Sequence, residues 1–452
     1  MNSSEARATW SLASLFGLRM LGLFMILPVF AIYGEQLAGS TPQLIGLAIG
    51  AYGLTQALLQ VPFGLLSDRI GRKPVIILGL IVFCVGSVVA AQSESIYGVI
   101  IGRALQGAGA IASAVMALLA DLTRDDQRAK AMALVGASIG LSFSLALIIG
   151  PVIAGIVHLQ GLFWVTALLA VGGIAVTVWV VPDPDSRRVF RDTRPVMDNL
   201  VDVLKNPDLL RLDLGIFLLH MVLTASFVVL PSWLVGQANI ESTHHWLVYL
   251  PVLFGSFILM LPLMIMAEKA GKVKQVFLFA IALLVVSLLA ISLWHHSLVS
   301  ILLGLFVFFW GFNLLEALLP SLVSKLAAPG YKGTSMGVYS TCQFLGAFVG
   351  GAGGGWLLGN FYGAAVYMVG SGLIAVWFLF ALGMRQPPNL HSLTLQLSHA
   401  SDLDTHVWVK RFMAIAGVEE AVVIVEDKMA YLKVDKSRLD QEQLLQLSQA
   451  SV

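Results

Sequence analysis

Residues 64–74 read Gly-Leu-Leu-Ser-Asp-Arg-Ile-Gly-Arg-Lys-Pro, and they form a short polar break between the apolar runs 43–66 and 74–93. Gly64 allows two helices to approach closely, and Gly71 permits a tight chain reversal. Pro74 suits the first turn of a helix, where its missing N–H costs nothing. The charged side chains of the break predict either an anchor on anionic headgroups or a set of ion pairs: Asp68, Arg69, Arg72 and Lys73.

Twelve apolar runs of similar length follow one another between residues 9 and 385. A helix of about 20 residues crosses the hydrocarbon layer, because backbone groups there must bond within the helix. Of the 452 residues 58% are hydrophobic and 12% charged, and the mean hydropathy is +0.86, which excludes a soluble enzyme and a disordered chain. The net charge of +1 argues against a nucleic-acid partner. We therefore predict a polytopic all-α membrane protein with spans at 9–34, 43–66, 74–93, 96–120, 130–157, 161–181, 209–236, 244–267, 274–294, 297–325, 333–358 and 362–384.

Lysine and arginine are distributed asymmetrically between the breaks. Apart from Arg19 and Arg103, which lie inside spans, those of the first 388 residues fall at the N-terminus, in alternate breaks, or at Arg385 after the last span. Because positive residues collect on the cytoplasmic side, this pattern predicts that both termini are cytoplasmic. We expect a multi-pass protein of a bacterial-type inner (plasma) membrane, surrounded by membrane lipids.

The composition divides the chain into four parts. We predict six-span bundles at 1–181 and 209–388, joined by a linker at 182–208 in which 195–207 form an amphipathic helix on the membrane surface. Residues 389–452 are richer in charge and predict a soluble cytoplasmic domain. Its expected order is a strand near 393–397, a helix at 404–416, strands at 418–425 and 429–434, and a helix at 440–450. This β-α-β-β-α order is typical of a small ferredoxin-like α+β unit.

The break after the eighth span repeats the pattern of the first one. Residues 268–272 read Glu-Lys-Ala-Gly-Lys, with the spacing of acid, base, glycine and base found at 68–72. This repeat indicates a duplication of a six-span unit. Transporters built from such parallel repeats bind their substrate between the two halves.

The stretch 64–74 resembles the loop 2–3 signature of the major facilitator superfamily, G-x-L-S-D-R-x-G-R-K-P, at every defined position. In the fourth span, residues 103–109 resemble the R-x-x-Q-G-x-G motif of the proton-coupled drug-efflux branch of that family. With its small C-terminal domain, the chain is similar to the YajR-type members. That domain also resembles heavy-metal-associated domains, but it has no cysteine, so a metal site is not implied. The resemblance covers about residues 9–385 and implies twelve transmembrane helices in two six-helix bundles.

The fifth span departs from the antiporter signature of this branch. Gly150-Pro151 is present, but alanine stands where three glycines are expected, at positions 137, 146 and 154. This departure weakens the prediction of antiport over symport. In span 11, Gly346, Gly350 and Gly354 recur at four-residue spacing, which predicts a close helix interface.

Ionisable groups inside spans are functional candidates, because burying an unpaired charge in a bilayer is costly. Glu316 lies in span 10 on one helix face with Asn313, and we predict that it takes up and releases a proton during the cycle. The alternative is a permanently paired carboxylate. Arg103 shares a face with Gln106; it is either satisfied by backbone carbonyls or, as the resemblance implies, part of the proton-coupling step.

Two further span residues are candidates. Arg19 is expected to bind an anionic group, to hold a carboxylate such as Glu316, or to be purely structural. His220, near the start of span 7, has a side chain suited to proton exchange, although packing is the commoner role of a lone histidine. Cys84 and Cys342 lie in apolar runs and are interpreted as packing residues, and no metal site is expected.

Asp121 ends span 4 close in sequence to Arg128. The family resemblance implies a cytoplasmic lock between the loop 2–3 motif, the end of span 4 and the start of span 11. We predict that Arg72 pairs with Asp121, and that Asp68 faces the N-terminus of span 11 near Gly333, where the helix dipole favours an anion. Both contacts are expected to hold the outward-open state and to break as the halves rock inward.

These features predict a secondary transporter that exports small amphipathic compounds in exchange for protons. It is not expected to be an enzyme, since no nucleophile–base set appears. No phosphate-binding motif is present, so the proton gradient is the expected energy source and no cofactor is required. One alternative is proton-coupled uptake of a metabolite. Another is a membrane sensor reporting through the C-terminal domain, which could instead regulate transport or mediate self-association.

Overall fold

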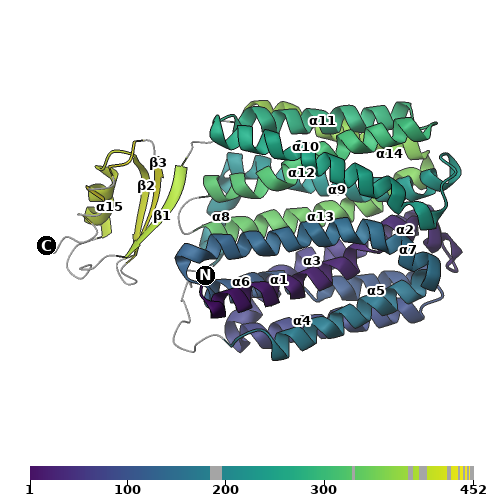
Figure 1. The fold of residues 1–452 in the computed structure, drawn as a ribbon, viewed down its shortest axis with the longest axis horizontal. Coiled ribbons are helices and arrows are strands. Elements are labelled where there is room, and N and C mark those ends of the chain that lie inside the picture. The colour runs from purple at the N-terminus through teal and green to yellow at the C-terminus, as the bar shows by residue number, and fades with distance from the viewer. Residues whose placement is uncertain are drawn as a thin grey trace.

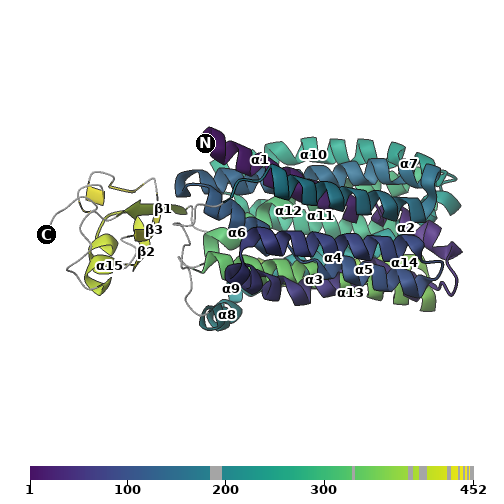
Figure 2. The same ribbon diagram turned by 90° about the horizontal axis from the view of Figure 1, so that it is seen from below.

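A computed structural model describes residues 1–183, 196–327, 331–384, 390–396, 405–424, 429–435, 438–440, 443, 444 and 447. Long helices lie side by side in one bundle, and a small sheet with a helix lies beyond one end of it (Figure 1). The N-terminus lies at that same end, which we call the domain end (Figures 1 and 2). The chain crosses the bundle once before the turn at 37–41 and crosses back before Gly71, so Gly71 lies at the domain end and the turn lies at the opposite end, called the far end. His158 lies beside Leu37 at the far end.

The first half of the bundle holds six spans. Its helices are α1 (Ser3–Phe24), α2 (Leu27–Tyr33), α3 (Pro42–Ile70), α4 (Arg72–Gln92), α5 (Ile96–Ala108), α6 (Ala112–Leu122) and α7 (Asp125–Trp179), with a 3-10 turn, η1 (Gly34–Gln36). The first span is interrupted between α1 and α2, and the fourth between α5 and α6. The long helix α7 contains two spans, because His158 adopts a positive φ of 56° and turns the chain.

The second half holds the other six spans. Its elements are α9 (Pro207–Gly236), η2 (Ser242–His244), α10 (Trp246–Lys269), α11 (Val273–Leu293), α12 (Leu298–Leu326), α13 (Lys332–Asn360) and α14 (Gly363–Leu382). In the described residues, ten helical segments are long and apolar enough to cross a membrane. One of them, 130–179, contains two spans, and the glycine-rich α13 adds the twelfth. The predicted fold of twelve transmembrane helices is therefore confirmed.

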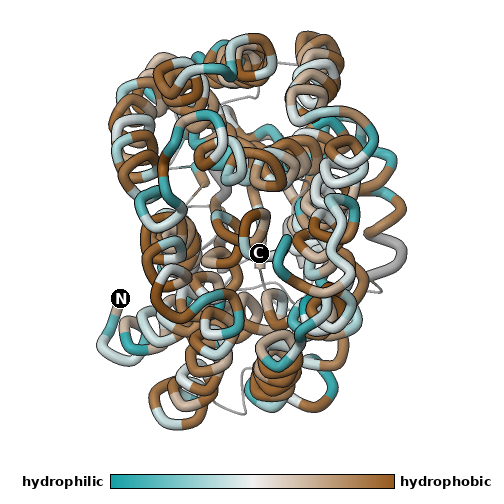
Figure 3. Tube along the Cα trace, turned by 90° about the vertical axis from the view of Figure 1, so that its right-hand side faces the viewer, coloured by the Kyte–Doolittle hydropathy of each residue, from teal (hydrophilic) through white to brown (hydrophobic). Residues whose placement is uncertain are grey.

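The outer surface of the bundle is apolar. Large aliphatic side chains such as Ile156, Leu303 and Leu379 are largely exposed, and hydrophobic residues lie on the outer as well as the inner sides of the helices (Figure 3). A soluble protein does not expose so much contiguous apolar surface. This surface is the one that hydrocarbon chains would cover.

Helix α13 presents glycines to two neighbours. Gly346 and Gly350 lie against the backbone carbonyls of Phe217 and Met221 on α9, and Gly354 continues that face. This is the close interface that the four-residue spacing predicted. A second glycine face of α13 packs on α3 in the other half, as described below.

The linker contains the predicted helix, observed as α8 (Val196–Lys205). It packs against α9 and the start of α13 at the domain end, where the Tyr331 hydroxyl donates to Asp202 Oδ2 at 3.4 Å. Val203 is buried and Leu204 is exposed. The side chain of Val196 and the arginine-rich stretch before it lie outside the described residues, so the expected membrane contact stays a prediction.

The C-terminal domain is a three-stranded antiparallel sheet with one helix. Its elements are β1 (Leu390–Gln396), α15 (Thr405–Met413), β2 (Val418–Ile424) and β3 (Met429–Asp435), and β3 lies between β1 and β2. Leu432 of β3 lies opposite Leu393 of β1 and Ala421 of β2. Trp408 and Phe412 of α15 cover the sheet and complete a small core. The first four elements of the predicted β-α-β-β-α order are confirmed, while the expected helix at 440–450 lies largely outside the described residues.

Candidate functional site

The loop between α3 and α4 is tied to the end of α6. Gly71 adopts a φ of 100°, which permits the sharp turn, and Pro74 lies in the first turn of α4 as predicted. The Arg72 guanidinium donates to Asp121 Oδ2 at 3.3 Å and to Ser67 Oγ at 2.7 Å, and it contacts the Asp68 carboxylate. The predicted pairing of Arg72 with Asp121 is therefore present.

The other charged residues of the motif have different surroundings. Lys73 donates to the Val181 carbonyl at 2.6 Å and pairs with Asp183 at 2.6 Å, which holds the start of α4 near the end of α7. Arg69 is exposed, and the side chain of Arg128 lies outside the described residues. Gly64 faces Ser113, whose Oγ would lie 3.2 Å from an added Cβ.

A buried carboxylate that the sequence analysis missed lies beside this motif. Glu5 is almost fully buried and accepts hydrogen bonds from the Arg124 guanidinium at 2.8 and 3.3 Å. It also accepts from the Asn2 backbone, in a capping box that begins α1. The signal in the sequence is the Asn-x-x-Glu spacing at the N-terminus, and the pair fixes α1 to the start of α7.

Two buried arginines lie inside the first half. Arg19 is 1% exposed and donates through Nη2 to Gln56 Oε1 and to the Gly109 carbonyl, both at 2.9 Å. That carbonyl is available because the interruption between α5 and α6 removes it from the helical ladder. Among the described residues, Arg19 Nε and Nη1 have no hydrogen-bond partner. Arg19 therefore does not hold Glu316 in this structure.

Arg103 is 2% exposed and is held mainly by neutral groups. It donates to Gln106 Oε1 at 2.8 Å and to the carbonyls of Ala48 and Ile49 at 3.4 and 3.5 Å. The carbonyl contacts are those of the first alternative for this residue, and a part in proton coupling stays a prediction. Tyr52, which the sequence analysis did not identify, connects the two arginines, because the guanidinium carbons of Arg19 and Arg103 lie 5.8 and 5.4 Å from its ring centroid.

The second half holds the acidic candidates. In the described residues, Glu316 Oε2 is buried without a hydrogen-bond partner. Asn313, one turn away on α12, donates to Ser256 Oγ at 3.1 Å. Gln343 Nε2 of α13 donates to His220 Nε2 at 2.8 Å, so this histidine is a hydrogen-bonded residue packed beside Phe312. The permanently paired carboxylate that was the alternative for Glu316 is not observed.

One acid of this half was missed by the sequence analysis. Asp213 of α9 is 4% exposed, and both of its carboxyl oxygens are buried without a partner among the described residues. In the sequence it lies close to the start of an apolar run, where it is indistinguishable from an acid at the membrane surface. Only the packing of α9 against α13 shows that it is enclosed.

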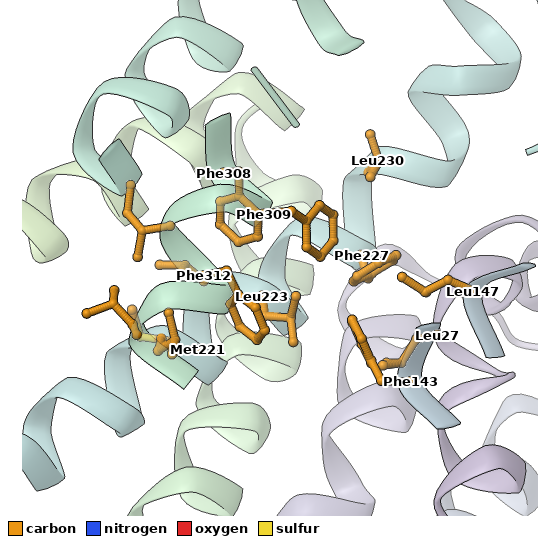
Figure 4. Close-up of a cluster of buried hydrophobic side chains, with 14 of the residues drawn as sticks. Leu27, Phe143, Leu147, Met221, Leu223, Phe227, Leu230, Phe308, Phe309 and Phe312 are labelled. Carbon is orange, nitrogen blue, oxygen red and sulfur yellow. The ribbon is translucent and has the colours of Figure 1, made fainter. Parts of the chain in front are cut away.

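Aromatic side chains fill the junction between the halves. Phe143 of α7 packs edge-to-face on Phe24 at 5.1 Å, and its ring lies 6.4 and 6.3 Å from Phe309 and Phe312 of α12. Figure 4 shows Phe143 and neighbouring apolar side chains of the first half facing Phe227 and the α12 phenylalanines. Glu316 lies four residues after Phe312 on the same helix, so a carboxyl group borders this apolar cluster.

The halves are joined closely at the far end. An added Cβ on Gly351 of α13 would lie 2.6 Å from the Gly46 carbonyl oxygen and 2.7 Å from the Gly50 nitrogen of α3. The Tyr33 hydroxyl also lies 3.2 Å from Ser242 Oγ across the junction. The far end is therefore closed. Near the domain end, Gly333 of α13 has open space around it.

This state corrects part of the predicted lock. The Arg72–Asp121 pair is formed although the far end is closed, and both residues belong to the first half. The pair is therefore not confined to the outward-open state. In the described residues, Asp68 makes no hydrogen bond or ion pair with α13. The contact of Asp68 near Gly333 stays a prediction for the opposite state.

The span-5 motif supports the packing of α7 on the interrupted first span. An added Cβ on Gly150 would lie 2.6 Å from the Met25 carbonyl oxygen, between α1 and α2. Pro151 continues within α7. The alanines at 146 and 154 are fully buried on the same helix.

Comparisons with known proteins agree with this architecture. The chain matches the model of the Major Facilitator Superfamily over residues 12–350 and 212–418. It is 48% identical over 437 residues to the inner membrane transport protein YajR of Escherichia coli, covering 96% of this chain and 95% of that protein. It is 25% identical over 344 residues to the multidrug resistance protein MdtH of Yersinia enterocolitica, covering 75% and 83%. A crystal structure of the nucleoside transporter NupG has a TM-score of 0.67 at 13% identity, covering 83% of this chain and 99% of that one, which shows the shared fold alone.

Proposed function

Because the chain belongs to the major facilitator superfamily of secondary transporters, we propose that it exports small amphipathic compounds from the cytoplasm in exchange for protons. It is a multi-pass inner-membrane transporter and not an enzyme. The energy source in this proposal is the proton gradient, and no cofactor takes part. Transport proceeds by alternating access, with the substrate held between the two halves.

The observation that carries the proposal is the aromatic junction with an unpartnered carboxyl group at its border. Phe24, Phe143, Phe309 and Phe312 provide flat apolar surfaces from both halves. Such surfaces bind apolar and aromatic compounds with little demand on their polar groups. Glu316 supplies one acidic group for the proton, or for a basic part of the compound.

Proton coupling follows from the surroundings of Glu316. An ionised carboxylate without a partner in a medium of low dielectric constant costs several kcal/mol, so its charge is tolerated only when water or a cation reaches it. Opening of one end admits water and allows the proton to leave, and closure favours the neutral acid. The structure has the far end closed, as one of the two states in such a cycle requires.

Two arguments support the direction of export. The Lys and Arg residues of the loops collect at the domain end, which we assign to the cytoplasm. MdtH, which shares the family and 25% identity, is named a multidrug resistance protein. The alanines in the span-5 motif are the feature that favours uptake instead, and the experiment below separates the two directions.

The test is a screen of amphipathic compounds in proteoliposomes with an imposed pH gradient, in which both the flux and its direction are recorded. We expect compound movement against its gradient when protons flow the other way, and loss of this movement in Glu316→Gln. Glu241→Gln, which makes the same change in an exposed loop of the far end, is the matched control. Flux in the same direction as the protons would support uptake, and undiminished pH-driven flux in Glu316→Gln would remove this residue from the mechanism.

A further inference from the structure

We propose that Asp213 is a second proton-exchanging acid, through which Glu316 exchanges protons with the aqueous phase at the domain end. The contribution of this proton exchange to transport rests on the proposed function. The protonation of Asp213 itself is testable without any transported compound.

The first argument is the isolation of Asp213. Its side chain is 4% exposed, and neither carboxyl oxygen has a hydrogen-bond partner among the described residues. A buried carboxyl group that served only structure would be expected to accept hydrogen bonds, because an unsatisfied one costs stability. The nearest cation along α9, Arg211, is paired with Asp208 at 2.6 Å. Asp213 therefore lacks the hydrogen bonds expected of a purely structural carboxyl group, which favours a role in proton exchange.

The second argument is its position relative to Glu316. With a rise of about 1.5 Å per residue, Asp213 lies about 9 Å above the domain-end start of α9, and Tyr339 about 10 Å above that of α13. Glu316 lies about 15 Å before the domain-end terminus of α12. Asp213 is therefore the shallower of the two acids.

The third argument is a group that connects them. Tyr339 of α13 is buried, and α13 packs against both α9, which carries Asp213, and α12, which carries Glu316. This packing brings Tyr339 within electrostatic range of both carboxyl groups, and Cys342, one turn further along α13, within range of Asp213. From α14, Trp377 approaches this region and donates to the Arg211 carbonyl at 3.3 Å, so its N–H is already used. From α8, Asp202 is engaged with Tyr331. In the described residues, the two titratable groups with an electrostatic contact to Asp213 are the weak acids Tyr339 and Cys342. The carboxyl group of Asp213 forms no ion pair there.

This arrangement defines the proton steps. A proton bound to an Asp213 oxygen leaves for a water molecule admitted from the domain end, and the carboxylate then accepts a proton that Glu316 releases. In this proposal the Tyr339 hydroxyl passes the proton on through intervening water, because it has no direct hydrogen bond to the partnerless oxygens of Asp213 and Glu316 in the described part of this structure. It donates its own proton toward one carboxylate while it accepts another from the side of the other acid. In each step one O–H bond breaks and one forms, and no net charge remains on Tyr339. Because two neighbouring carboxylates repel each other, the loss of one proton disfavours the loss of the second.

The experiment is infrared difference spectroscopy of the full-length protein in lipid, after a step between about pH 5 and about pH 9, a range above that in which exposed carboxyl groups titrate. We expect two carboxyl C=O bands, of which Glu316→Gln and Asp213→Asn each remove one. In Asp213→Asn the Glu316 band should remain but should change about 100-fold more slowly, the lower end of what a positioned proton-transfer group contributes. Tyr339→Phe should retain both bands and slow the Glu316 response.

Two controls keep the result interpretable. Asp208→Asn makes the same change on the same helix at a partly exposed site and should leave both bands and their rates unaltered. Asp213→Glu should restore a second band, which a loss of folding in Asp213→Asn would not predict. A spectrum and a Glu316 rate unchanged by Asp213→Asn would overturn the inference, even if proton-driven flux is observed. Conversely, absence of any pH-driven flux would contradict the proposed function while leaving the Asp213 band in place.

Discussion

The close packing of α13 on α3 makes a sharp prediction for Gly351→Ala. The added methyl group would lie 2.6 Å from the Gly46 carbonyl oxygen, 2.7 Å from the Gly50 nitrogen and 2.9 Å from the Gly50 Cα. All three are backbone atoms, so no side chain can rotate away. Ordinary contact begins at 3.4 Å, and the two helices would have to separate by about 3.4 − 2.6 = 0.8 Å at this point. The strain exists only while the far end is closed.

The magnitude follows from the cost of overpacking a rigid interface, which is about 1–3 kcal/mol. At about 1.4 kcal/mol per factor of ten, the ratio of closed to open far ends should fall by about 5- to 150-fold. Alanine also favours helix over glycine by about 1 kcal/mol, but this gain is the same in both states because α13 is helical in each.

The assay is a distance measurement by electron paramagnetic resonance between spin labels on the two halves. Glu35 and Asn360 are exposed at the far end, one in each half, and can carry the labels after replacement by cysteine. The two native cysteines, Cys84 and Cys342, are replaced by serine first. We expect Gly351→Ala to move population from the short distance to a longer one.

The matched control is Gly353→Ala, two residues along the same helix, where an added Cβ meets nothing within 4 Å. It makes the same chemical change and the same gain in helix propensity. A distance distribution unaffected by Gly351→Ala, or shifted equally by Gly353→Ala, would refute the argument that backbone contact at the far end sets the equilibrium.

Three further predictions use the same preparations. Asp68→Asn should shift the spin-label population toward the closed far end by about two- to fivefold. The reason is that the Asp68 carboxylate is expected near the N-terminus of α13 only in the state with an open far end, where it contributes about 0.3–1 kcal/mol. An unchanged distance distribution would show that Asp68 is not part of the lock. Arg103→Lys keeps the positive charge but loses the hydrogen bonds of the guanidinium group to Gln106 and to the α3 carbonyls. Thermal denaturation should therefore show that the protein is about 1.5–3 kcal/mol less stable. An unchanged melting temperature would contradict a stabilising role of these hydrogen bonds. Deletion of 389–452 should leave a folded bundle, because the C-terminal domain has its own hydrophobic core. Altered flux of the truncated protein in proteoliposomes would indicate that the domain regulates transport. Unchanged flux with a lost signal would indicate a sensor.

Local patterns in the sequence were sufficient where the structure depends on neighbours along the chain. The turn at Gly71, the placement of Pro74 and the helix of the linker follow from residue type and spacing. The glycines of span 11 predicted close packing, and the pattern at 389–434 predicted the order of strands and helix along the C-terminal domain.

Features that depend on tertiary contacts could not be predicted in the same way. Arg19 donates to a glutamine of α3 and to a backbone carbonyl at the break between α5 and α6. The periodicity of the sequence predicts neither of these partners. Asp213 has the sequence position of a surface acid, and only the packing of other helices on α9 buries it. The Arg72–Asp121 pair is present while the far end is closed, and both residues belong to one half, which a prediction based on a signature could not show.

The buried charges are separated by sign between the two halves. In the described part of the first half they are Arg19 and Arg103, apart from Glu5, which Arg124 neutralises at the domain end. In the second half they are Asp213 and Glu316, whose Oε2 atom is buried. Opposite charges in the two halves attract one another, by about 1 kcal/mol for a pair on the order of 15 Å apart at an effective dielectric constant of about 20. Protonation of the two acids removes this attraction without breaking any named hydrogen bond. Proton binding therefore changes the free energy of bringing the halves together, which is the quantity that a proton-coupled alternating-access cycle has to change.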